Sequence, residues 1–216
     1  MKGTIYLIGG GELRDGDTQL IDEDILSLTP EGSTFVFFGF AAYDSTDYAA
    51  AITSVYGDKY TVVVPTEARG REFAIDAIKS AAVIYLGGGD TEQLLGVFAQ
   101  WGLVEYLHAA IDRGVHVAGM SAGAQALSNW YIYDDDTRFE LRKGWAIAPV
   151  GVLVHANPTL FDKAKLLWSD HGMTGSYQFV AIGEGAAWRV DTLKATKIGS
   201  GKIWKIPPRT NVQTQK

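Results

Sequence analysis

Short, continuously apolar runs alternate with amphipathic stretches over about the first 130 residues of the chain. The apolar runs are 4–9, 33–40, 60–66, 81–89 and 115–120, and the amphipathic stretches between and after them are 18–28, 47–57, 72–81, 91–100, 103–114 and a helix from about 122. Strands that are apolar throughout, rather than at every second position, are typical of a sheet covered on both faces. Repetition of strand and helix predicts an α/β fold with a doubly wound, mostly parallel sheet flanked by helices.

The pattern becomes less regular after Trp130. Residues 131–145 are first acidic and then basic, and they predict an irregular loop or a hairpin. Residues 150–158 predict a strand that ends at His155, and 160–168 predict a helix. Two segments with internal glycine turns, 179–190 and 193–206, predict strand pairs. With no linker or repeat in view, we expect one domain over 1–206 and a flexible tail over 207–216.

Composition and charge narrow the classes of partner. The formal net charge is −6 and no long basic run is present, so neither nucleic acid nor an anionic membrane is an expected partner. The chain contains no cysteine, which excludes disulfides, thiolate metal sites and cysteine nucleophiles. The apolar run after Lys2 is short and ends in glycines, so we interpret it as a first strand and not as a signal peptide. No apolar run reaches the roughly 18 residues of a membrane span, and we expect a cytoplasmic protein.

The pentapeptide from Gly119 to Gly123 has the pattern G-x-S-x-G, with Ser121 at its centre. Between a strand and a helix, this pattern predicts a nucleophile elbow, a sharp turn that projects the serine hydroxyl above the sheet edge. The N–H of Ala122 would then lie at a helix N-terminus, where it can bind a developing oxyanion. Close packing of a helix on a sheet is the alternative explanation of these small residues.

A nucleophilic serine needs a base, and His155 is the best placed of the four histidines. It ends an apolar strand, so it can reach the same sheet edge as Ser121. His116 starts the strand that leads to Ser121 and lies roughly 15 Å away along it. The helical pattern around His108 favours a surface or packing role, and the position of His171 near a helix end favours capping.

The predicted acid is Glu184, which follows an apolar strand between two glycines. An acid at the end of a buried strand is costly unless it is paired, so a partner is expected. The competing acids are Asp134, Asp135 and Asp136, whose cluster in a polar segment is also explained by simple solvation. The order serine, acid, histidine belongs to α/β-hydrolases, whereas Ser121, His155 and Glu184 follow a different order.

A second glycine run, 87–89, follows the fourth predicted strand. It lacks the lysine of a phosphate-binding P-loop and the spacing of a dinucleotide-binding loop. We therefore expect the N–H of Gly88 or Gly89 to be a second oxyanion donor beside that of Ala122. The earlier run, Gly9–Gly11, is followed by Glu12, which would repel a phosphate.

Together these segments resemble peptidase family S51, the group that includes aspartyl dipeptidase and cyanophycinase. The resemblance runs through "IYLIGGGE", "IYLGGGDTEQLL", "GMSAGAQAL", "VHANPTLFDKAKLL" and "AIGEGAAW". It implies a three-layer architecture related to class I glutamine amidotransferases, and a triad with Ser121 as nucleophile, His155 as base and Glu184 as its partner. It implies neither a cofactor nor a metal.

Departures from the family motifs concern substrate recognition. Asp90 stands where the family commonly has asparagine, lysines stand near expected arginines after His155, and the second strand ends "FFGFAAYDS". Recognition of an N-terminal aspartate would need a guanidinium in the pocket. The candidates by sequence neighbourhood are Arg138, Arg142 and Arg189, and the residues expected to contact substrate are Asp90, Thr91, Asn157 and Arg138.

The sequence therefore predicts a serine peptidase that acts on short peptides, with formation of a homodimer left open. One alternative is an esterase of the α/β-hydrolase type that takes its acid from residues 134–136. The other is a non-catalytic, amidotransferase-like binding protein that keeps the glycine-flanked serine for packing, in which case Ser121 would be buried.

Overall fold

The computed structural model describes residues 3–206 apart from 136, 172–177 and 192–193. The predicted tail, 207–216, and Asp136 of the acidic cluster lie outside the described residues. The helices are α1 (Gln19–Leu26), α2 (Thr46–Tyr56), α3 (Gly70–Ser80), α4 (Thr91–Trp101), α5 (Leu103–Arg113), α6 (Ala122–Leu127) and α7 (Pro158–Asp170), with 3₁₀ turns at Leu13–Asp15, Phe40–Ala42 and Glu67–Arg69. The strands are β1 (Ile5–Ile8), β2 (Thr34–Phe38), β3 (Thr61–Val63), β4 (Val83–Leu86), β5 (His116–Met120), β6 (Ser128–Asp134), β7 (Phe139–Lys143), β8 (Ala148–Leu153), β9 (Gln178–Ile182), β10 (Ala186–Val190), β11 (Ala195–Gly199) and β12 (Ile203–Ile206).

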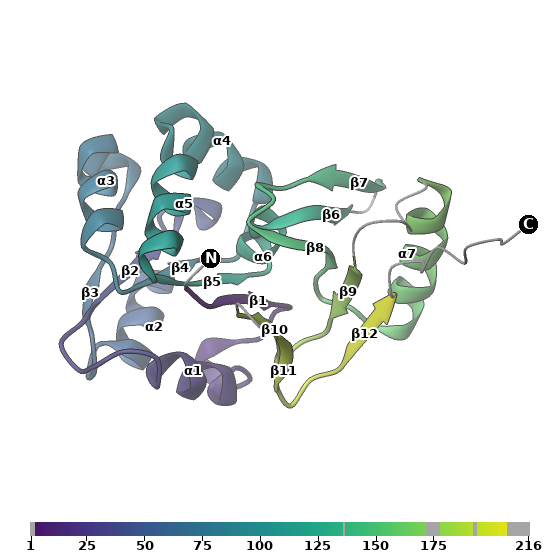
Figure 1. The fold of residues 1–216 in the computed structure, drawn as a ribbon, viewed down its shortest axis with the longest axis horizontal. Helices are drawn as coiled ribbons and strands as arrows, with labels where there is room; N and C mark the ends of the chain where they lie inside the picture. The colour runs from purple at the N-terminus through teal and green to yellow at the C-terminus, as the bar shows by residue number, and fades with distance from the viewer. Residues whose placement is uncertain (1–2, 136, 172–177, 192–193, 207–216) are drawn as a thin grey trace, which may run out of the picture.

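The main sheet has the strand order β11-β10-β1-β5-β4-β2-β3 (Figure 1). The five strands from β1 to β3 in this order run parallel. At the edge beside β1, β10 pairs antiparallel with β1, and β11 pairs antiparallel with β10. In register, Ile5 of β1 lies opposite Val117 of β5, which lies opposite Ile84 of β4. The predicted α/β fold with a mostly parallel sheet is confirmed.

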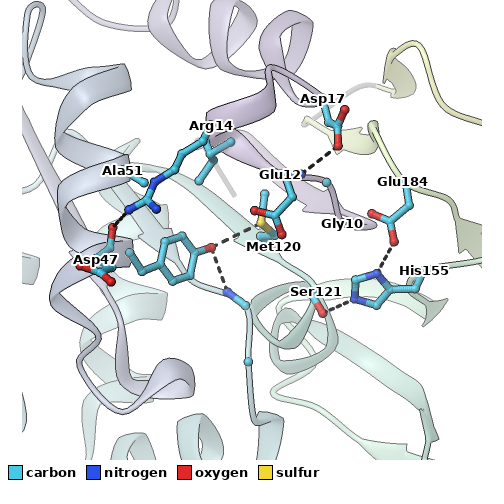
Figure 2. A pocket seen from close by; sticks show the side chains of 15 residues that line it. Gly10, Glu12, Arg14, Asp17, Asp47, Ala51, Met120, Ser121, His155 and Glu184 are labelled. Carbon is cyan, nitrogen blue, oxygen red and sulfur yellow. Dashed lines mark hydrogen bonds and ion pairs between the residues drawn. The ribbon is translucent and has the colours of Figure 1, made fainter.

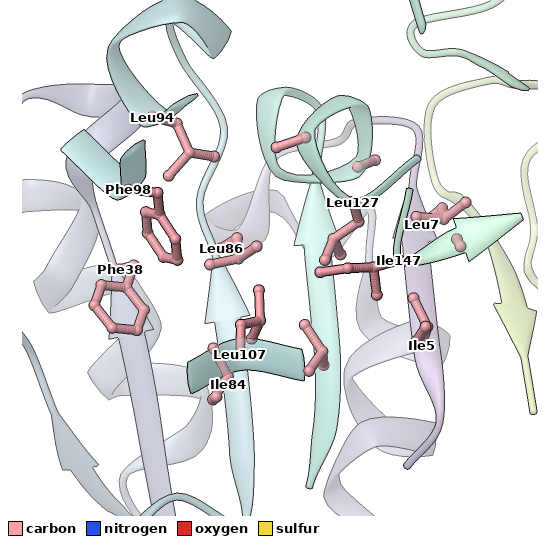
Figure 3. Packing of buried hydrophobic residues seen from close by; sticks show 14 of the residues in the cluster. Ile5, Leu7, Phe38, Ile84, Leu86, Leu94, Phe98, Leu107, Leu127 and Ile147 are labelled. Carbon is pink, nitrogen blue, oxygen red and sulfur yellow. The ribbon is translucent and has the colours of Figure 1, made fainter. Parts of the chain in front are cut away.

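Helices cover both faces of the main sheet (Figure 1). On one face, Ile21 of α1 and Ile52 of α2 share a buried cluster with Phe35 of β2. On the other, Leu94 of α4 and Leu107 of α5 belong to the larger buried cluster drawn in Figure 3. Successive side chains of a strand point to opposite faces, which explains why these strands are apolar at every position.

A second sheet, which the sequence did not predict, has the order β12-β9-β8-β6-β7. The predicted loop or hairpin at 131–145 contributes to it, because β6 and β7 pair antiparallel. Helix α7 packs on this sheet, where Trp168 is fully buried and its ring centroid lies 4.8 Å from that of Phe179. Gly151 of β8 makes room for the indole, since a Cβ there would lie 2.4 Å from the Trp168 ring.

The two strand pairs predicted within 179–190 and 193–206 are wrong in their pairing. Strand β9 pairs with β8 and β12, whereas β10 pairs with β1 and β11. The turn from Gly183 to Gly185 thus carries the chain from the second sheet to the main one. The Gly183 N–H donates to the Lys202 carbonyl and the Gly201 N–H to the Gly185 carbonyl, which ties this crossing to the return crossing. Glu184 therefore lies at the junction of the two sheets.

The helix that follows Ser121 is also part of this junction. Helix α6 has six residues and is buried throughout. It ends where the Ser128 hydroxyl donates to the Gln125 carbonyl at 2.7 Å, a local hydrogen bond that competes with helix continuation. From Ser128 the chain enters β6 of the second sheet. The short helix α6 therefore connects the end of β5 in the main sheet to the start of β6 in the second sheet.

No single helix in the described ranges is long and apolar enough to cross a membrane. Helices α4 and α5 meet that requirement only when taken together, and they are bent by 90° at Gly102. Leu94 and Phe98 of α4 and Leu107 of α5 belong to the buried core on the main sheet.

His116, which the sequence disfavoured as a base, accepts a backbone hydrogen bond that depends on its protonation state. Its Nδ1 accepts the Thr4 backbone N–H at 3.2 Å, which requires an unprotonated Nδ1. Burial, with a smaller effect of Arg189, lowers the pKa of His116 from its usual 6.5. The folded protein favours the neutral ring, so its contribution is present above the unfolded pKa and is lost as pH falls through the lowered folded pKa.

We therefore expect the melting temperature of the wild type to fall between about pH 7 and about pH 5 partly through His116. In His116→Asn, whose amide oxygen can accept the Thr4 N–H without titrating, this fall should be shallower. Thermal melts of both proteins across that range test the expectation. Parallel curves for the two proteins would show that His116 does not contribute.

Candidate active site

Ser121 lies at the tight turn between β5 and α6, with a φ of 48° and a ψ of −106° that few non-glycine residues adopt. Flanking glycines permit the turn. A Cβ on Gly119 would lie 2.4 Å from the carbonyl carbon of Gly123, and a Cβ on Gly123 would lie 2.3 Å from the Leu86 carbonyl oxygen. Close helix–sheet packing, the alternative explanation of these glycines, is thus present, but the Ser121 side chain itself is only partly buried.

His155 and Glu184 approach Ser121 from the second sheet (Figure 2). Ser121 Oγ lies 2.7 Å from His155 Nε2, and His155 Nδ1 lies 2.5 Å from Glu184 Oε1. With its proton on Nδ1, the imidazole donates to the carboxylate and accepts the serine hydroxyl, so this tautomer satisfies both contacts. Ser121, His155 and Glu184, which the sequence predicted to act together, are thus joined by two successive hydrogen bonds.

The histidine–glutamate pair is open to solvent. The side chain of His155 is 51% exposed and that of Glu184 is 57% exposed. The partner expected for Glu184 is His155, although the crossing between the sheets leaves the Glu184 side chain at the surface. Solvent screens such a pair and limits its contribution to stability. What the contact does fix is the orientation of the ring and the nitrogen that carries the proton.

Gly10, in the first glycine run, packs against this pair. Its φ is +148°, and a Cβ there would lie 2.3 Å from Glu184 Oε2 and 2.6 Å from His155 Nδ1. The Gly10 carbonyl accepts the Gly185 N–H at 3.0 Å, and the Gly9 carbonyl accepts the His155 N–H at 2.9 Å. Sequence reasoning considered this run only as a phosphate loop. Its position at the end of β1 was the signal that could have linked it to the site.

We expect Gly10→Ala to lower kcat/KM by about 10²-fold, because the added methyl group displaces the imidazole from its partner and misplacement of about 1 Å has an effect of that size. Gly96→Ala is the matched control. A Cβ on Gly96 meets no atom within 4 Å, and alanine favours a helix interior such as α4. Assays of both variants beside the wild type provide the comparison. Full activity in Gly10→Ala would show that the site tolerates this shift.

Two backbone segments present N–H groups near Ser121. Ala122 is the first residue of α6, so its N–H has no acceptor within the helix. Gly88 is also close, since a Cβ on it would lie 3.4 Å from Ser121 Cβ. Its N–H donates to the hydroxyl of Tyr48 at 3.1 Å. The N–H of Gly89, in contrast, has no acceptor among the residues that the structure describes.

A cavity of about 680 Å³ includes the three residues (Figure 2). It is lined by Gly10, Gly11, Glu12, Leu13, Arg14, Asp17, Asp47, Tyr48, Ala51, Gly88, Gly89, Met120, Ser121, His155 and Glu184. Within the described part of the chain, four carboxylates and one guanidinium line it. That guanidinium belongs to Arg14, which donates to the Asp47 backbone carbonyl at 2.9 Å. Sequence reasoning missed Arg14, which lies in the turn after the first glycine run.

A second cavity of about 360 Å³ also touches Ser121 and His155, and Asp90 and Thr91 line it. Asp90 caps α4, since its Oδ1 accepts the backbone N–H groups of the next turn. Thr91 is buried and its hydroxyl donates to Gln125. Two of the four residues expected to contact substrate thus lie beside Ser121, although each already has a partner in the protein.

The other residues expected to contact substrate lie elsewhere. Asn157 caps α7 by accepting the Leu160 N–H at 3.0 Å, and it lines neither cavity. The expectation that one of the three candidate arginines lies in the pocket is wrong, because each is paired with a carboxylate outside both cavities. The pairs are Arg138 with Asp135, Arg142 with Glu92, and Arg189 with Asp24.

Asp134 and Asp135, the described members of the acidic cluster, do not orient His155. Asp134 lines the smaller cavity, but the Nδ1 of His155 is bonded to Glu184. Asp135 lies at the β6–β7 turn, where hydrogen bonds from Thr137 and Arg138 lower its pKa. Among the described residues, no group of three or more His, Asp or Glu side chains is placed to hold a metal ion.

Comparisons with known proteins identify a family and a shared fold. The model of peptidase family S51 matches residues 5–197. The "Uncharacterized peptidase YgaJ" of Bacillus subtilis (strain 168) is 34% identical over 130 residues, which cover 57% of this chain and 55% of that protein. The chain thus aligns with about half of the length of this curated relative.

Two solved structures share the fold. A peptidase from an acI-B1 Actinobacterium has a TM-score of 0.66 at 20% identity, covering 96% of this chain and 95% of its own. A putative peptidase E protein from Listeria monocytogenes EGD-e has a TM-score of 0.67 at 17% identity, covering 92% of this chain and 99% of its own. At these identities, the likeness establishes the fold.

Proposed function

The chain belongs to peptidase family S51, and from this premise we propose that it is a serine peptidase that hydrolyses short peptides through an acyl-enzyme on Ser121. One observation carries the proposal: Ser121 Oγ lies 2.7 Å from His155 Nε2 inside a cavity large enough for a small peptide. In the proposed enzyme, the turn at Ser121 is a nucleophile elbow, and Ser121, His155 and Glu184 form the catalytic triad.

The reaction begins when His155 Nε2 takes the proton of the Ser121 hydroxyl as Oγ attacks the peptide carbonyl carbon. Glu184 keeps the other ring proton on Nδ1 and stabilises the imidazolium that forms. The imidazolium then gives its Nε2 proton to the leaving amine as the C–N bond breaks. A water molecule, deprotonated by the same nitrogen, hydrolyses the ester and restores Ser121.

The oxyanion of each tetrahedral intermediate is stabilised by backbone N–H groups. Ala122 supplies one at the start of α6, and the segment of Gly88 and Gly89 supplies the other. Their proximity to Ser121 supports this assignment. Loss of one such donor typically lowers the rate by about 10²–10³-fold, so the second donor matters to the reaction.

The lining of the larger of the two cavities, which we call the main cavity, supports a peptide substrate whose amino and carboxyl ends are free. A dipeptide carries an ammonium group at one end and a carboxylate at the other. The carboxylates of Glu12, Asp17 and Asp47 suit the ammonium group, and Arg14, whose guanidinium is bonded only to a backbone carbonyl among the described residues, suits the carboxylate. We therefore propose that the enzyme acts on dipeptides and other very short peptides.

The two alternatives are less well supported. An esterase with its acid at 134–136 would need one of these aspartates on His155 Nδ1, which Glu184 occupies. A binding protein that keeps Ser121 only for packing would bury it, whereas its side chain is partly exposed and lines both cavities.

A panel of peptides tests the proposal. Free dipeptides and tripeptides, their N-acetylated and C-amidated forms, and simple p-nitrophenyl esters are incubated with the protein. We expect cleavage of the free peptides and weaker cleavage of both blocked forms. Hydrolysis of the esters with no cleavage of any peptide would favour the esterase, and no hydrolysis at all would contradict the proposal.

A further inference from the structure

Tyr48 connects the two segments that flank the nucleophile. It lies in the first turn of α2 and lines the same cavity as Ser121. Its hydroxyl accepts the Gly88 N–H at 3.1 Å and donates to Met120 Sδ at 3.3 Å. Met120 immediately precedes Ser121, and Gly88 lies beside it. A single hydroxyl thus links the glycine segment after β4 to the residue at the end of β5.

The ring of Tyr48 is held from several sides. It makes an edge contact with Phe37 of β2, with ring centroids 4.9 Å apart. Gly87 leaves just enough room for it, since a Cβ there would lie 3.0 Å from Tyr48 Cε1. Ser45 Oγ accepts the Tyr48 backbone N–H at 3.3 Å and fixes the start of α2. Withdrawal of the hydroxyl from Gly88 would therefore require movement of packed elements, so this contact is a fixed part of the site.

The hydrogen bonds of the glycine segment leave one N–H available. Three of the four backbone N–H groups from 87 to 90 have acceptors: Gly87 donates to the Phe38 carbonyl at 3.0 Å, Gly88 to the Tyr48 hydroxyl, and Asp90 to the Ala41 carbonyl at 2.7 Å. Gly89 is the exception among the described residues. Its φ of +131° is open to glycine, and a Cβ there would lie 2.2 Å from the Ala41 carbonyl oxygen.

We propose that Tyr48 is a positioning residue for this reaction: by holding the Gly88 N–H, it orients the segment so that Gly89, and not Gly88, donates to the oxyanion together with Ala122. The inference rests on the proposed function, because an oxyanion forms only if Ser121 attacks a carbonyl. It selects one donor from the two glycines that the sequence left open.

The charge state of Tyr48 is compatible with this role. Burial raises the pKa of its hydroxyl to about 12. The hydrogen bond from Gly88 acts in the opposite direction, and Glu12 and Asp22 make smaller contributions that raise the pKa. The group is therefore a neutral phenol at the pH of an ordinary assay. A neutral hydroxyl can accept from Gly88 and donate to Met120 at the same time, and it adds no negative charge beside the oxyanion.

Tyr48→Phe tests the role, because it keeps the ring and removes the hydroxyl. The matched control is Tyr85→Phe, which removes another buried phenol hydroxyl from the same aromatic cluster. That hydroxyl has no hydrogen-bond partner among the described residues, and Tyr85 does not line the main cavity. For both variants, the measurements are kcat and KM for the best free peptide, the inhibition constant of a peptide trifluoromethyl ketone that forms a tetrahedral adduct, and the melting temperature.

In Tyr48→Phe, we expect kcat to fall by about 10- to 100-fold while KM changes by less than about threefold, since the oxyanion contacts act on the transition state. Binding of the ketone should weaken in parallel with kcat. In Tyr85→Phe, all three kinetic constants should stay close to those of the wild type, because an unpaired hydroxyl contributes no hydrogen bond.

An increase of kcat in Tyr48→Phe would overturn the inference, because it would mean that the hydroxyl competes with the oxyanion for Gly88. Unchanged kcat, or a loss shared equally with Tyr85→Phe, would overturn it as well. These results leave the proposed function intact as long as the wild type depends on Ser121. Peptide hydrolysis that survives in Ser121→Ala would instead overturn the proposed function, and the role of Tyr48 with it.

Discussion

Ser121→Ala is expected to lower kcat/KM for peptide hydrolysis by at least about 10⁴-fold, because it removes the only atom that can form the acyl-enzyme in the proposed reaction. Alanine keeps the Cβ, so the turn between β5 and α6 retains its geometry. The measurement is the rate with the best free peptide, beside a thermal melt that checks folding.

Ser80→Ala is a suitable control for this variant. Ser80 ends α3, and its hydroxyl donates only to the Ala77 carbonyl within the described structure. It lines neither cavity, so its replacement should leave kcat/KM unchanged. Substantial activity in a folded Ser121→Ala protein would contradict the assignment of the nucleophile.

Glu184→Gln is expected to lower kcat by about 10³–10⁴-fold, with a small change in KM. The amide cannot stabilise the imidazolium that forms when His155 takes the serine proton, and its NH₂ group can hold the ring in the wrong tautomer. Because the Glu184 side chain is 57% exposed, the substitution should change the melting temperature little. Activity would then be lost without loss of the fold.

Asp134→Asn provides the comparison that separates the two possible acids. Asp134 lines the smaller cavity near His155, but Glu184 is the residue bonded to Nδ1. We expect Asp134→Asn to retain most of the activity of the wild type. The reverse result, with Asp134→Asn inactive and Glu184→Gln active, would favour an esterase-like arrangement.

The main sheet could be predicted because its signals are local. Strands such as β2 and β4 are apolar runs followed by glycine, and each is followed along the chain by a helix of suitable period. The second sheet could not be predicted in this way. Apart from the hairpin of β6 and β7, its strands pair across long stretches of chain, as β8 does with β6 and β9, and no local pattern specifies which partner a strand takes. For the same reason, β9 and β10 were expected to pair with each other.

The three residues of the site could be predicted because each follows a strand and carries the chemistry that the others need. Their supporting residues could not, because those contacts depend on how the sheets meet. Gly10 touches a histidine and a glutamate more than 140 positions away, and Tyr48 of α2 reaches Gly88 in the segment after β4. Proximity in sequence to Ser121 did not identify the arginine in the cavity. Arg14 lines the cavity, whereas Arg138, which is closer in sequence to Ser121, does not.

The central claim is that Ser121 is an activated nucleophile, and labelling with a fluorophosphonate tests it most directly. The folded protein is treated with the reagent, digested, and analysed by mass spectrometry to locate the adduct. We expect a single adduct on the peptide that contains Ser121, and none in Ser121→Ala or in protein unfolded before treatment. An unlabelled Ser121 in folded protein, or an adduct on a different residue, would contradict the claim.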